Sequence, residues 1–480
     1  MFRQASSLLP VGTVFTWLKR VLLATAVAAI AFQWANSRIA IVSQNQNPSH
    51  PVVPTAYRAF HSMAIGLREG RIGQVDLLLL ALPSYARPIS LSAPYERLPP
   101  GAEHRWMNFY TLDVGYSFIV EAARLAFPAL PDNHLRALAL QLVADAALVP
   151  IVFLLFSQWN TALGVVAAYL YSSNQVFFDL VSFPFYYYWD IPLTFVVLGA
   201  MLLAYRRPAE TTRWLTLAGL TLGFGVWLRG SWWPLSAFLS VAAACTPALR
   251  KKLLVPIVAF AVLATPQVVR ASVARGQLTF TTRTVWHVAL VGLGYSPNPY
   301  GLRAQDEVVF ELTRQKYGVE FKYEDYSAHD QAAKKEWFSI WAKDRGFVIR
   351  SFFVRLKDSV EGGPTTTVQS FLSVSNLTYR LACLLGLIAM ILRGGDKRVL
   401  GLAAAGTHVI YVVLTCVFYF VSLAYESVSE VTLLILFVGG LEAVLYAGQR
   451  ALAFGPLRRV ASLGSIGGGA TEPGAMKEHA

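Results

Sequence analysis

Charge and cysteine are both scarce in this chain of 480 residues. Only 14% of the residues are charged, whereas 55% are hydrophobic, and apolar runs of about 20 residues recur along the sequence. This pattern predicts an all-α polytopic membrane protein. The three cysteines lie inside apolar runs, which excludes both a disulfide framework and a zinc-ligand spacing; they are Cys245, Cys383 and Cys416.

The sequence also lacks the common motifs for metals and nucleotides. No D-x-D, H-E-x-x-H, P-loop or dinucleotide-binding pattern occurs in a suitable context, so we expect no metal and no cofactor. The net charge of +13 gives no reason to expect nucleic acid as a partner, because many basic residues flank the apolar runs. Such residues set membrane topology and lie near anionic lipid headgroups.

The apolar runs predict about ten transmembrane helices, at residues 18–42, 134–156, 160–178, 189–205, 213–228, 232–247, 253–270, 377–393, 398–423 and 430–447. If the spans alternate in direction, the Lys and Arg clusters beside them all fall on one face. The positive-inside rule makes that face cytoplasmic and places both termini there. The first run has the charge pattern of a signal peptide, but no clear A-x-A cleavage site follows it, so we expect it to remain as a helix.

Six regions follow from this layout, and two of them lie outside the membrane. The segment 43–133 combines helical apolar spacing with a Pro-rich stretch, which predicts helices on the outer membrane surface joined by an irregular loop. The segment 271–376 carries charged helical sequence that a membrane interior excludes, which predicts a small helical lid. The other regions are the N-terminus with the first span, the main span block, the C-terminal spans and a Gly-rich cytoplasmic tail that we expect to be largely disordered: residues 1–42, 134–270, 377–447 and 448–480.

Three stretches carry a resemblance to a known family. Asp113-Val-Gly-Tyr-Ser-Phe precedes the second span and is similar to a D-P-G-Y-P-L-type element of that family. WDIPLTFVVLGAMLLAYRRP, from Trp189, is similar to its fourth span with a leading acid, and LAGLTLGFGVWLRGSWWPL, residues 217–235, to an L-G-L-x-x-x-x-R-P-type element. Together with the order of the regions, these stretches make residues 20–445 resemble the GT-C membrane glycosyltransferases, the superfamily of the protein mannosyltransferases.

Two segments depart from the family pattern. Relatives often carry an Asp-Glu pair soon after the first span, whereas VSQNQNPSHPVVPTAY, residues 42–57, holds no acid. Many relatives have E-R-Y near the start of the last span, whereas this chain has Glu426-Ser427-Val428 and lacks the arginine. The resemblance therefore leaves the base, the donor and the acceptor open in detail.

The resemblance implies transfer of one sugar from a polyprenyl-phosphate donor to an acceptor hydroxyl on the outer face of a bacterial inner membrane. The acceptor could be a cell-envelope glycan, a glycolipid or a protein, and membrane lipids surround the chain. Because the lipid phosphate leaves already ionised, the chemistry needs a base for the acceptor and cations for the phosphate. Two other classes stay open: a lipid or polysaccharide transporter or flippase, although we detect no internal repeat typical of that class, and a noncatalytic scaffold.

Asp113 is the first candidate base. It lies in the outer loop ahead of an amphipathic helix, which would hold the carboxylate at headgroup level. Asp190, where a short outer loop enters the fourth span, is the second candidate. Each acid could instead be a helix N-cap that accepts backbone N–H bonds. The reserve candidates are Asp76, Glu103 and Asp179.

Arg229 is the predicted ligand of the donor phosphate. A guanidinium binds phosphate oxygens with a planar fork and stacks on aromatic rings. On the predicted topology Arg229 is the only Lys or Arg in the three short outer loops. It could also be an interfacial anchor within an aromatic belt, because three tryptophans flank it: Trp227, Trp232 and Trp233.

Weaker candidates lie in the two outer segments. His104 and Arg105, just ahead of the Asp113 motif, could bind the donor phosphate or form a loop salt bridge. Four residues of the second outer segment could bind the sugar or acceptor, or could pack the lid: Trp286, His287, Tyr295 and Asn298. Asp145, midway along the second span, is costly in lipid, so we expect a structural hydrogen bond in the protein interior.

Overall fold

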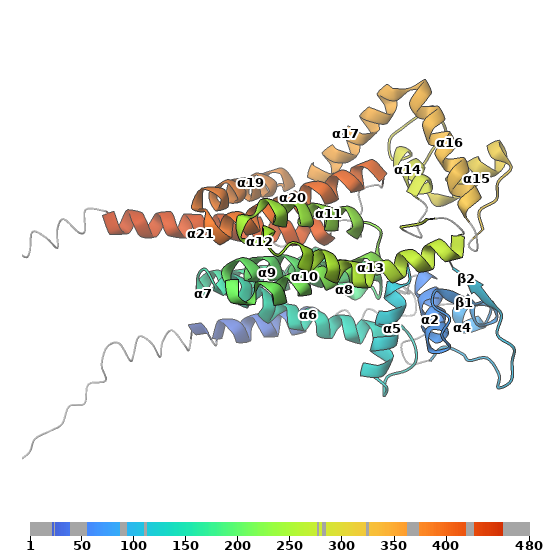
Figure 1. Cartoon of the computed structure of the whole chain (residues 1–480), viewed down its shortest axis with the longest axis horizontal. Helices are drawn as coiled ribbons and strands as arrows, with labels where there is room; N and C mark the ends of the chain where they lie inside the picture. Colours follow the sequence, from blue (N-terminus) through green and yellow to red (C-terminus); the bar gives the residue numbers. More distant parts are fainter. Residues whose placement is uncertain are drawn as a thin grey trace, which may run out of the picture.

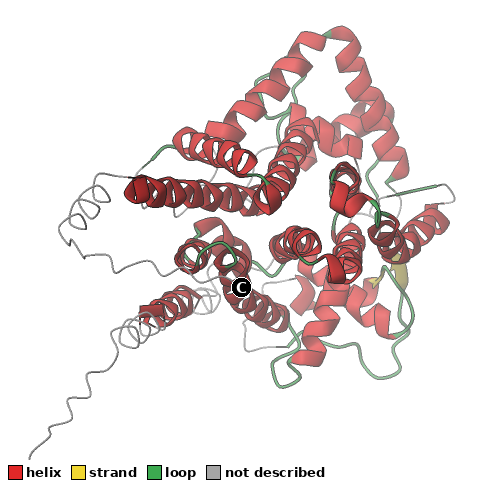
Figure 2. Cartoon of the chain, turned by 60° about the vertical axis from the view of Figure 1, so that its left-hand side comes forward, coloured by secondary structure: helices red, strands yellow, loops and turns green. Residues whose placement is uncertain are grey.

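The computed structural model describes residues 22–23, 25–38, 55–86, 94–109, 113–275, 278–280, 285–322, 326–361, 374–418 and 427–454. Within these ranges the regular structure is helical apart from one small two-stranded sheet, as Figure 2 shows. In Figure 1 the long apolar helices run side by side, and the first outer segment and the lid lie together at their right-hand ends. The predicted class, an all-α multi-pass membrane protein, is confirmed.

A helix lies within each predicted span. The first span holds the helical residues 22–23 and 25–38, and the others hold α6 (His134–Ser157), α7 (Thr161–Ser172), α9 (Asp190–Arg206), α10 (Thr211–Leu228), α11 (Trp232–Cys245), α13 (Leu254–Arg275), α19 (Asn376–Arg393), α20 (Gly395–Phe418) and α21 (Ser427–Phe454). Shorter helices connect them: α8 (Gln175–Ser182), η1 (Tyr186–Trp189), η2 (Pro208–Glu210) and α12 (Pro247–Arg250).

Not every one of these helices meets the length and composition of a membrane span. Six helices of the described chain are long and apolar enough to cross a membrane, and α7 and α11 are shorter apolar helices. The number of ten spans therefore stays a prediction. The predicted disordered tail overlaps α21 as far as Phe454, and the rest of the tail lies outside the described residues.

The first outer segment is a small folded layer rather than helices and loop alone. It contains α2 (Thr55–Arg68), β1 (Gln74–Asp76), α3 (Leu77–Leu80), α4 (Pro83–Ala86), β2 (Trp106–Asn108) and α5 (Gly115–Ala126). The strands pair antiparallel, with Val75 opposite Met107, and this pairing was not expected from the sequence. The rings of Tyr57, Phe60 and Tyr116 form the core beneath it.

Tyr187 and Trp189 join this layer to the span block. Both side chains pack against the hydrophobic core of the span block and also against the core of the first outer segment. The short helix η1 therefore lies at the seam between the two cores. The candidate site described below is built around this seam.

The second outer segment is helical where the structure describes it, and its role as a lid stays a prediction. It contains α14 (Val285–Leu293), α15 (Asp306–Tyr317), α16 (Ser327–Lys343) and α17 (Arg345–Glu361). Gly318 ends α15 in the left-handed conformation, with φ of 66°, which glycine adopts without strain. The lid has a hydrophobic core of its own, which contains Leu290, Val309 and Ala333. In Figure 1, α17 runs back from the lid towards α19 and α20.

Asp145 of α6 forms the predicted structural hydrogen bonds. Its carboxylate is fully buried and accepts from the Trp34 indole at 2.7 Å, the Arg38 guanidinium at 3.0 Å and the Tyr171 hydroxyl at 2.6 Å. The acid therefore joins the first helix to α6 and α7. A buried pair of this kind must keep both charges, because either one alone would be uncompensated.

We expect Asp145→Ala to destabilise the protein by about 3–5 kcal/mol, since Arg38 would be left as a buried charge without its partner. The double variant Arg38→Met with Asp145→Leu should recover most of this loss, because apolar residues of similar volume often replace a buried pair well. Thermal unfolding in detergent measures both effects. Equal losses in the single and double variants would contradict the assignment.

The lid should lose stability as the pH falls from about 6.5 towards 4. Burial lowers the pKa of His329 from 6.5 to about 4, so within this window the folded lid binds fewer protons than the unfolded lid, and acid favours unfolding. Hydrogen exchange of α16, corrected for the intrinsic effect of pH, should show weaker protection at about pH 5 than at pH 7. The non-titrating variant His329→Gln is the control, and the same pH dependence in both proteins would refute the prediction.

Candidate functional site

One buried ion pair lies where several helix ends meet. Nη1 of Arg229 is 2.5 Å from Oδ2 of Asp190, and the two side chains are 2% and 0% exposed. Asp190 is the first residue of α9, and Arg229 directly follows α10. The sequence singled these two residues out separately, and the structure makes them direct partners.

Local sequence brings the two side chains together. Pro192 lies in the first turn of α9, where a missing N–H leaves no helical hydrogen bond unmade. Arg229 is extended, with φ of −156° and ψ of 140°, so the chain turns sharply between α10 and α11. The turn places Trp232, the first residue of α11, beside the same carboxylate.

Asp190 is held from several directions. The Trp232 indole donates to Oδ1 at 2.9 Å, and the hydroxyls of Tyr411 and Ser427 lie 3.4 Å and 3.5 Å from Oδ2. A Cβ on Gly225 would come within 2.3 Å of the Trp232 ring, so only glycine leaves the space in which the indole sits. Ser427 stands where the family resemblance leads one to expect an arginine.

Aromatic rings enclose the guanidinium of Arg229. Its Nη1 donates to the Tyr411 hydroxyl at 2.9 Å. Its central carbon lies 4.9 Å and 5.8 Å from the ring centres of Tyr187 and Tyr186. Cation–π contacts are stronger where water is excluded. The pair is therefore neutral overall, and one hydroxyl and two aromatic rings position its cation.

Asp113 comes just before α5, whose first residue, Gly115, packs against the end of α10. The side chain of Asp113 is 1% exposed. The N-cap of α5 is Val114, whose side chain makes no capping hydrogen bond, so Asp113 does not occupy the cap position. The backbones of Gly115 and Trp227 are in contact, since a Cβ on Gly115 would meet the Trp227 carbonyl carbon at 2.5 Å. Gly115 follows Asp113 by two residues in the sequence, and Trp227 precedes Arg229 by two residues.

His104 and Arg105 lie just before strand β2 of the first outer segment. Nδ1 of His104 is 2.6 Å from Oδ2 of Asp76, and the backbone N–H groups of Arg105 and Leu78 donate to Oδ1. Asp76 therefore caps α3 and joins this helix to the residues just before β2. His104 also stacks on the Trp106 ring. These contacts match the loop salt bridge that was the alternative for His104.

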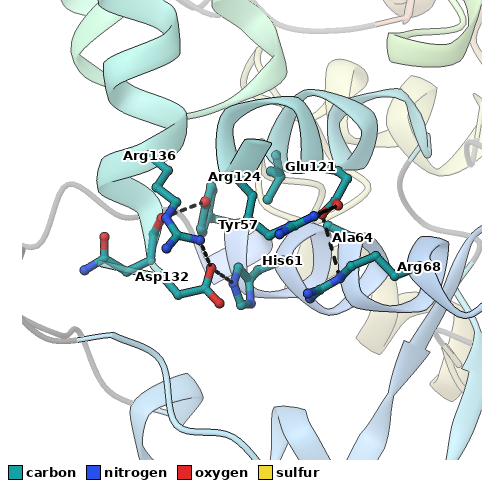
Figure 3. A pocket seen from close by; sticks show the side chains of 10 residues that line it. Tyr57, His61, Ala64, Arg68, Glu121, Arg124, Asp132 and Arg136 are labelled. Atoms are coloured by element: carbon teal, nitrogen blue, oxygen red, sulfur yellow. Dashed lines mark hydrogen bonds and ion pairs between the residues drawn. The ribbon is translucent and has the colours of Figure 1, made fainter. Parts of the chain in front are cut away.

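A cavity of about 400 Å³ lies beside His104. Acids, bases and rings share its wall, including His61, Glu69, Tyr95 and Asp132. A second, smaller pocket shares part of this wall, and Figure 3 shows its charged side chains pointing toward one another. A hydrogen bond from His61, together with the positive charges of Arg136 and Arg97, holds the pKa of Asp132 well below its usual range. The cavity wall thus offers hydrogen bonds and rings, which suit a polar acceptor.

Two of the predicted sugar-binding residues lie inside the lid. His287 is buried, with its Nδ1 at 2.9 Å from Nε2 of His329 and its Nε2 at 3.0 Å from the Asp306 carboxylate. The ring of Trp286 packs against that of Trp337. These contacts agree with the alternative interpretation, in which the segment packs the lid.

The other two residues follow α14 in the chain. Asn298 donates to the carbonyls of Ser296 and Leu302 and accepts from two backbone N–H groups, which closes its own loop. Burial and a hydrogen bond to Asp358 on α17 raise the pKa of the Tyr295 hydroxyl. A role for these residues in sugar binding stays a prediction.

Tyr411 and Ser427 are two of the site residues that the sequence did not reveal. Both lie within or beside apolar runs, and neither a Tyr nor a Ser in such a run is unusual enough to draw attention. Of the reserve acids, Glu103 is exposed and Asp179 accepts a hydrogen bond from Gln175 at 2.7 Å. Within the described residues, no group of three or more His, Cys, Asp and Glu side chains is placed to hold a metal ion.

Comparison with known proteins finds no matching family model and no similar curated protein. Among solved structures, the chain is similar to the oligosaccharyltransferase AglB from Archaeoglobus fulgidus, in complex with an inhibitory peptide and a dolichol-phosphate. The identity is 15% and the TM-score 0.46, over 95% of this chain and 53% of that one. This chain therefore spans about half the length of that archaeal protein. The apo form of the archaeal enzyme gives a TM-score of 0.48 at 15% identity, over 91% and 53%.

The chain is also similar to ArnT from Cupriavidus metallidurans bound to undecaprenyl phosphate. The identity is 12% and the TM-score 0.36, over 88% of this chain and 77% of that one. AglB and ArnT both belong to the GT-C membrane glycosyltransferases, the superfamily that the sequence resembles. With identities of 15% or less and TM-scores below 0.5, these likenesses assign no activity to this chain.

Proposed function

We propose that the chain is a membrane glycosyltransferase that moves one sugar from a polyprenyl-phosphate donor to an acceptor hydroxyl on the outer face of a bacterial inner membrane. The acceptor is a cell-envelope glycan, a glycolipid or a protein. Both termini lie in the cytoplasm, and the sugar is transferred with inversion at the anomeric carbon.

A single observation supports this proposal most strongly. The two candidate acids and the candidate cation come from three separate segments; two of them form an ion pair, and the third lies two residues before a glycine that packs on the helix that Arg229 follows. Asp190 and Arg229 are in direct contact, and Asp113 is tied to the same helix end by the packing of Gly115 on Trp227. Glycosyl transfer from a lipid phosphate needs a base and a phosphate-binding cation at one site, and this grouping supplies both.

Asp113 is the better base of the two acids. A general base needs a carboxylate oxygen directed at the acceptor hydroxyl. The oxygens of Asp190 are fixed by Arg229 and Trp232 within the ion pair. Asp113 precedes α5 in the first outer segment, on the side from which the acceptor is proposed to approach. Asp190 then acts as a positioning residue, because its carboxylate fixes the plane of the guanidinium that faces the donor phosphate.

Transport of a lipid or polysaccharide is the second candidate function. The observation that favours it is the polar content of the span block: Glu430 is buried near Asn174, with 3.5 Å between the side chains, and His408 is hydrogen-bonded to Ser429 at 2.9 Å. Ionisable residues within spans often mark transport pathways. Assays that follow the sugar and the lipid separately distinguish transport from transfer.

We expect Asp113→Asn to lower turnover by about 100- to 10,000-fold, the usual effect of removing a general base. The amide keeps the size and hydrogen-bonding capacity of the side chain but cannot take the proton. Donor binding and thermal stability should stay near those of the native protein. Turnover of labelled donor by purified protein measures the effect.

A loss of less than about tenfold in Asp113→Asn would overturn the assignment of Asp113 and make Asp190 the leading base. Glu121→Gln on the same helix α5 is the matched control, because Glu121 is paired with Arg124 at 2.6 Å and lies away from the ion pair. That variant should retain turnover.

Changes at Arg229 should separate donor binding from stability. Arg229→Ala should weaken binding of the polyprenyl-phosphate donor more than Arg229→Lys does, because lysine keeps the charge but loses the planar fork. Arg229→Ala should also cost about 3–5 kcal/mol of stability, since Asp190 loses its partner. Asp190→Asn with Arg229→Gln removes both charges and should restore stability without restoring donor affinity. Near-native donor affinity in all these variants would leave Arg229 with a structural role alone.

A further inference from the structure

Three arginines of the described chain are buried, and one of them differs from the others. Arg38, Arg229 and Arg355 are each 3% exposed or less. Arg38 is paired with Asp145 and Arg229 with Asp190. Nε and Nη1 of Arg355, on the lid helix α17, have no hydrogen-bond partner among the described residues. A buried guanidinium without a counter-charge is costly, so a bound anion would explain its presence.

Ser351 points to the same ligand chemistry. It lies four residues before Arg355, so both side chains face the same side of α17. Ser351 is fully buried, and its hydroxyl also lacks a hydrogen-bond partner in the described part of the chain. Two positions on one helix face thus offer unused N–H and O–H donors. Phosphate oxygens accept from both kinds of donor.

The location fits a phosphate at the membrane surface. One turn beyond Arg355, the carbonyl of Ser359 accepts from Arg380 at 2.5 Å. Arg380 lies in the first turns of α19, a candidate membrane span. Arg355 is therefore within about 6 Å, along the axis of α17, of the level at which a span leaves the membrane. Lipid phosphates lie at this level.

Helix α20 connects this position to the ion pair. Cys416 lies beside Arg355, and Tyr411 of the same helix donates to Asp190. The two α20 residues are about 7.5 Å apart along the helix axis. Burial lowers the pKa of Arg355 to about 10, with Cys416 acting in the opposite direction. The guanidinium thus stays charged at neutral pH.

We propose that Arg355 and Ser351 form a binding site for the phosphate of a polyprenyl-phosphate lipid, between the lid helix α17 and the outer end of α20. The identity of the lipid rests on the proposed function, whereas the recognition of a phosphate rests on the unused donors.

The test compares two properties of the full-length protein in detergent: stability without ligand, and affinity for undecaprenyl phosphate. Arg355→Met should leave the ligand-free melting temperature unchanged or higher, because it removes a buried charge for which the described part of the chain provides no counter-charge. The same variant should bind undecaprenyl phosphate at least about tenfold more weakly, the usual loss for a charge-assisted hydrogen bond. Ser351→Ala should cause a smaller loss in the same direction. Arg350→Met, an exposed arginine on the same helix, is the matched control and should bind like the native protein.

Three further ligands separate the possible sources of the phosphate. Inorganic phosphate, phosphatidylglycerol and undecaprenol should each bind much more weakly than undecaprenyl phosphate. Equal affinity for phosphatidylglycerol, or a lower melting temperature of Arg355→Met with unchanged lipid affinity, would overturn the proposal. Lipid binding is measured without sugar transfer. If Arg355→Met loses lipid binding while no donor supports transfer, the glycosyltransferase function fails and the phosphate site stands. If the native and Arg355→Met proteins transfer sugar with equal KM, the function stands and the phosphate site fails.

Discussion

The buried ion pair of Asp190 and Arg229 is the interaction on which the outer half of this molecule depends. Each charge alone would be strongly unfavourable in an apolar interior, so the two must stay together. Asp190 is the first residue of α9, and Arg229 directly follows α10, so the ion pair fixes the start of one helix beside the end of the other. Trp232, Tyr411 and Ser427 add contacts from α11, α20 and α21. The positions of the surrounding helices are therefore coupled to one electrostatic constraint.

Under the proposed function, the same constraint prepares a reaction site between the membrane and the outer segments. The first outer segment packs on the end of α10 through Gly115, two residues after Asp113. The lid helix α17, which carries the buried Arg355, packs against α20. Under the proposed function, a lipid donor would meet both Arg229 and Arg355 and an acid of the first outer segment. The buried pair Arg38–Asp145, by contrast, is joined by hydrogen bonds from Trp34 and Tyr171 and has a structural role.

Each predicted span contains a helix, because an apolar run of about 20 residues leaves few alternatives to that structure. The sequence also identifies Asp145, since an acid in the middle of a span must find a partner. The pairing of Asp190 with Arg229 cannot be derived in this way, because the residues are 39 positions apart and Tyr411 lies a further 182 positions along the chain from Arg229. Only tertiary packing decides such contacts. The two-stranded sheet of β1 and β2 was not predicted, because three-residue strands carry too little pattern to detect.

The central claim is that the chain cleaves a lipid-phosphate sugar and passes the sugar on. The most direct measurement incubates the purified protein with sugar-labelled polyprenyl phosphates from bacterial lipid extracts and candidate acceptors, and follows both the sugar and the lipid. Our account predicts that label leaves the lipid fraction, appears on one class of acceptor, and is matched by an equal amount of released polyprenyl phosphate. Passage of intact labelled donor across proteoliposomes, with no sugar transferred from any donor, would contradict it.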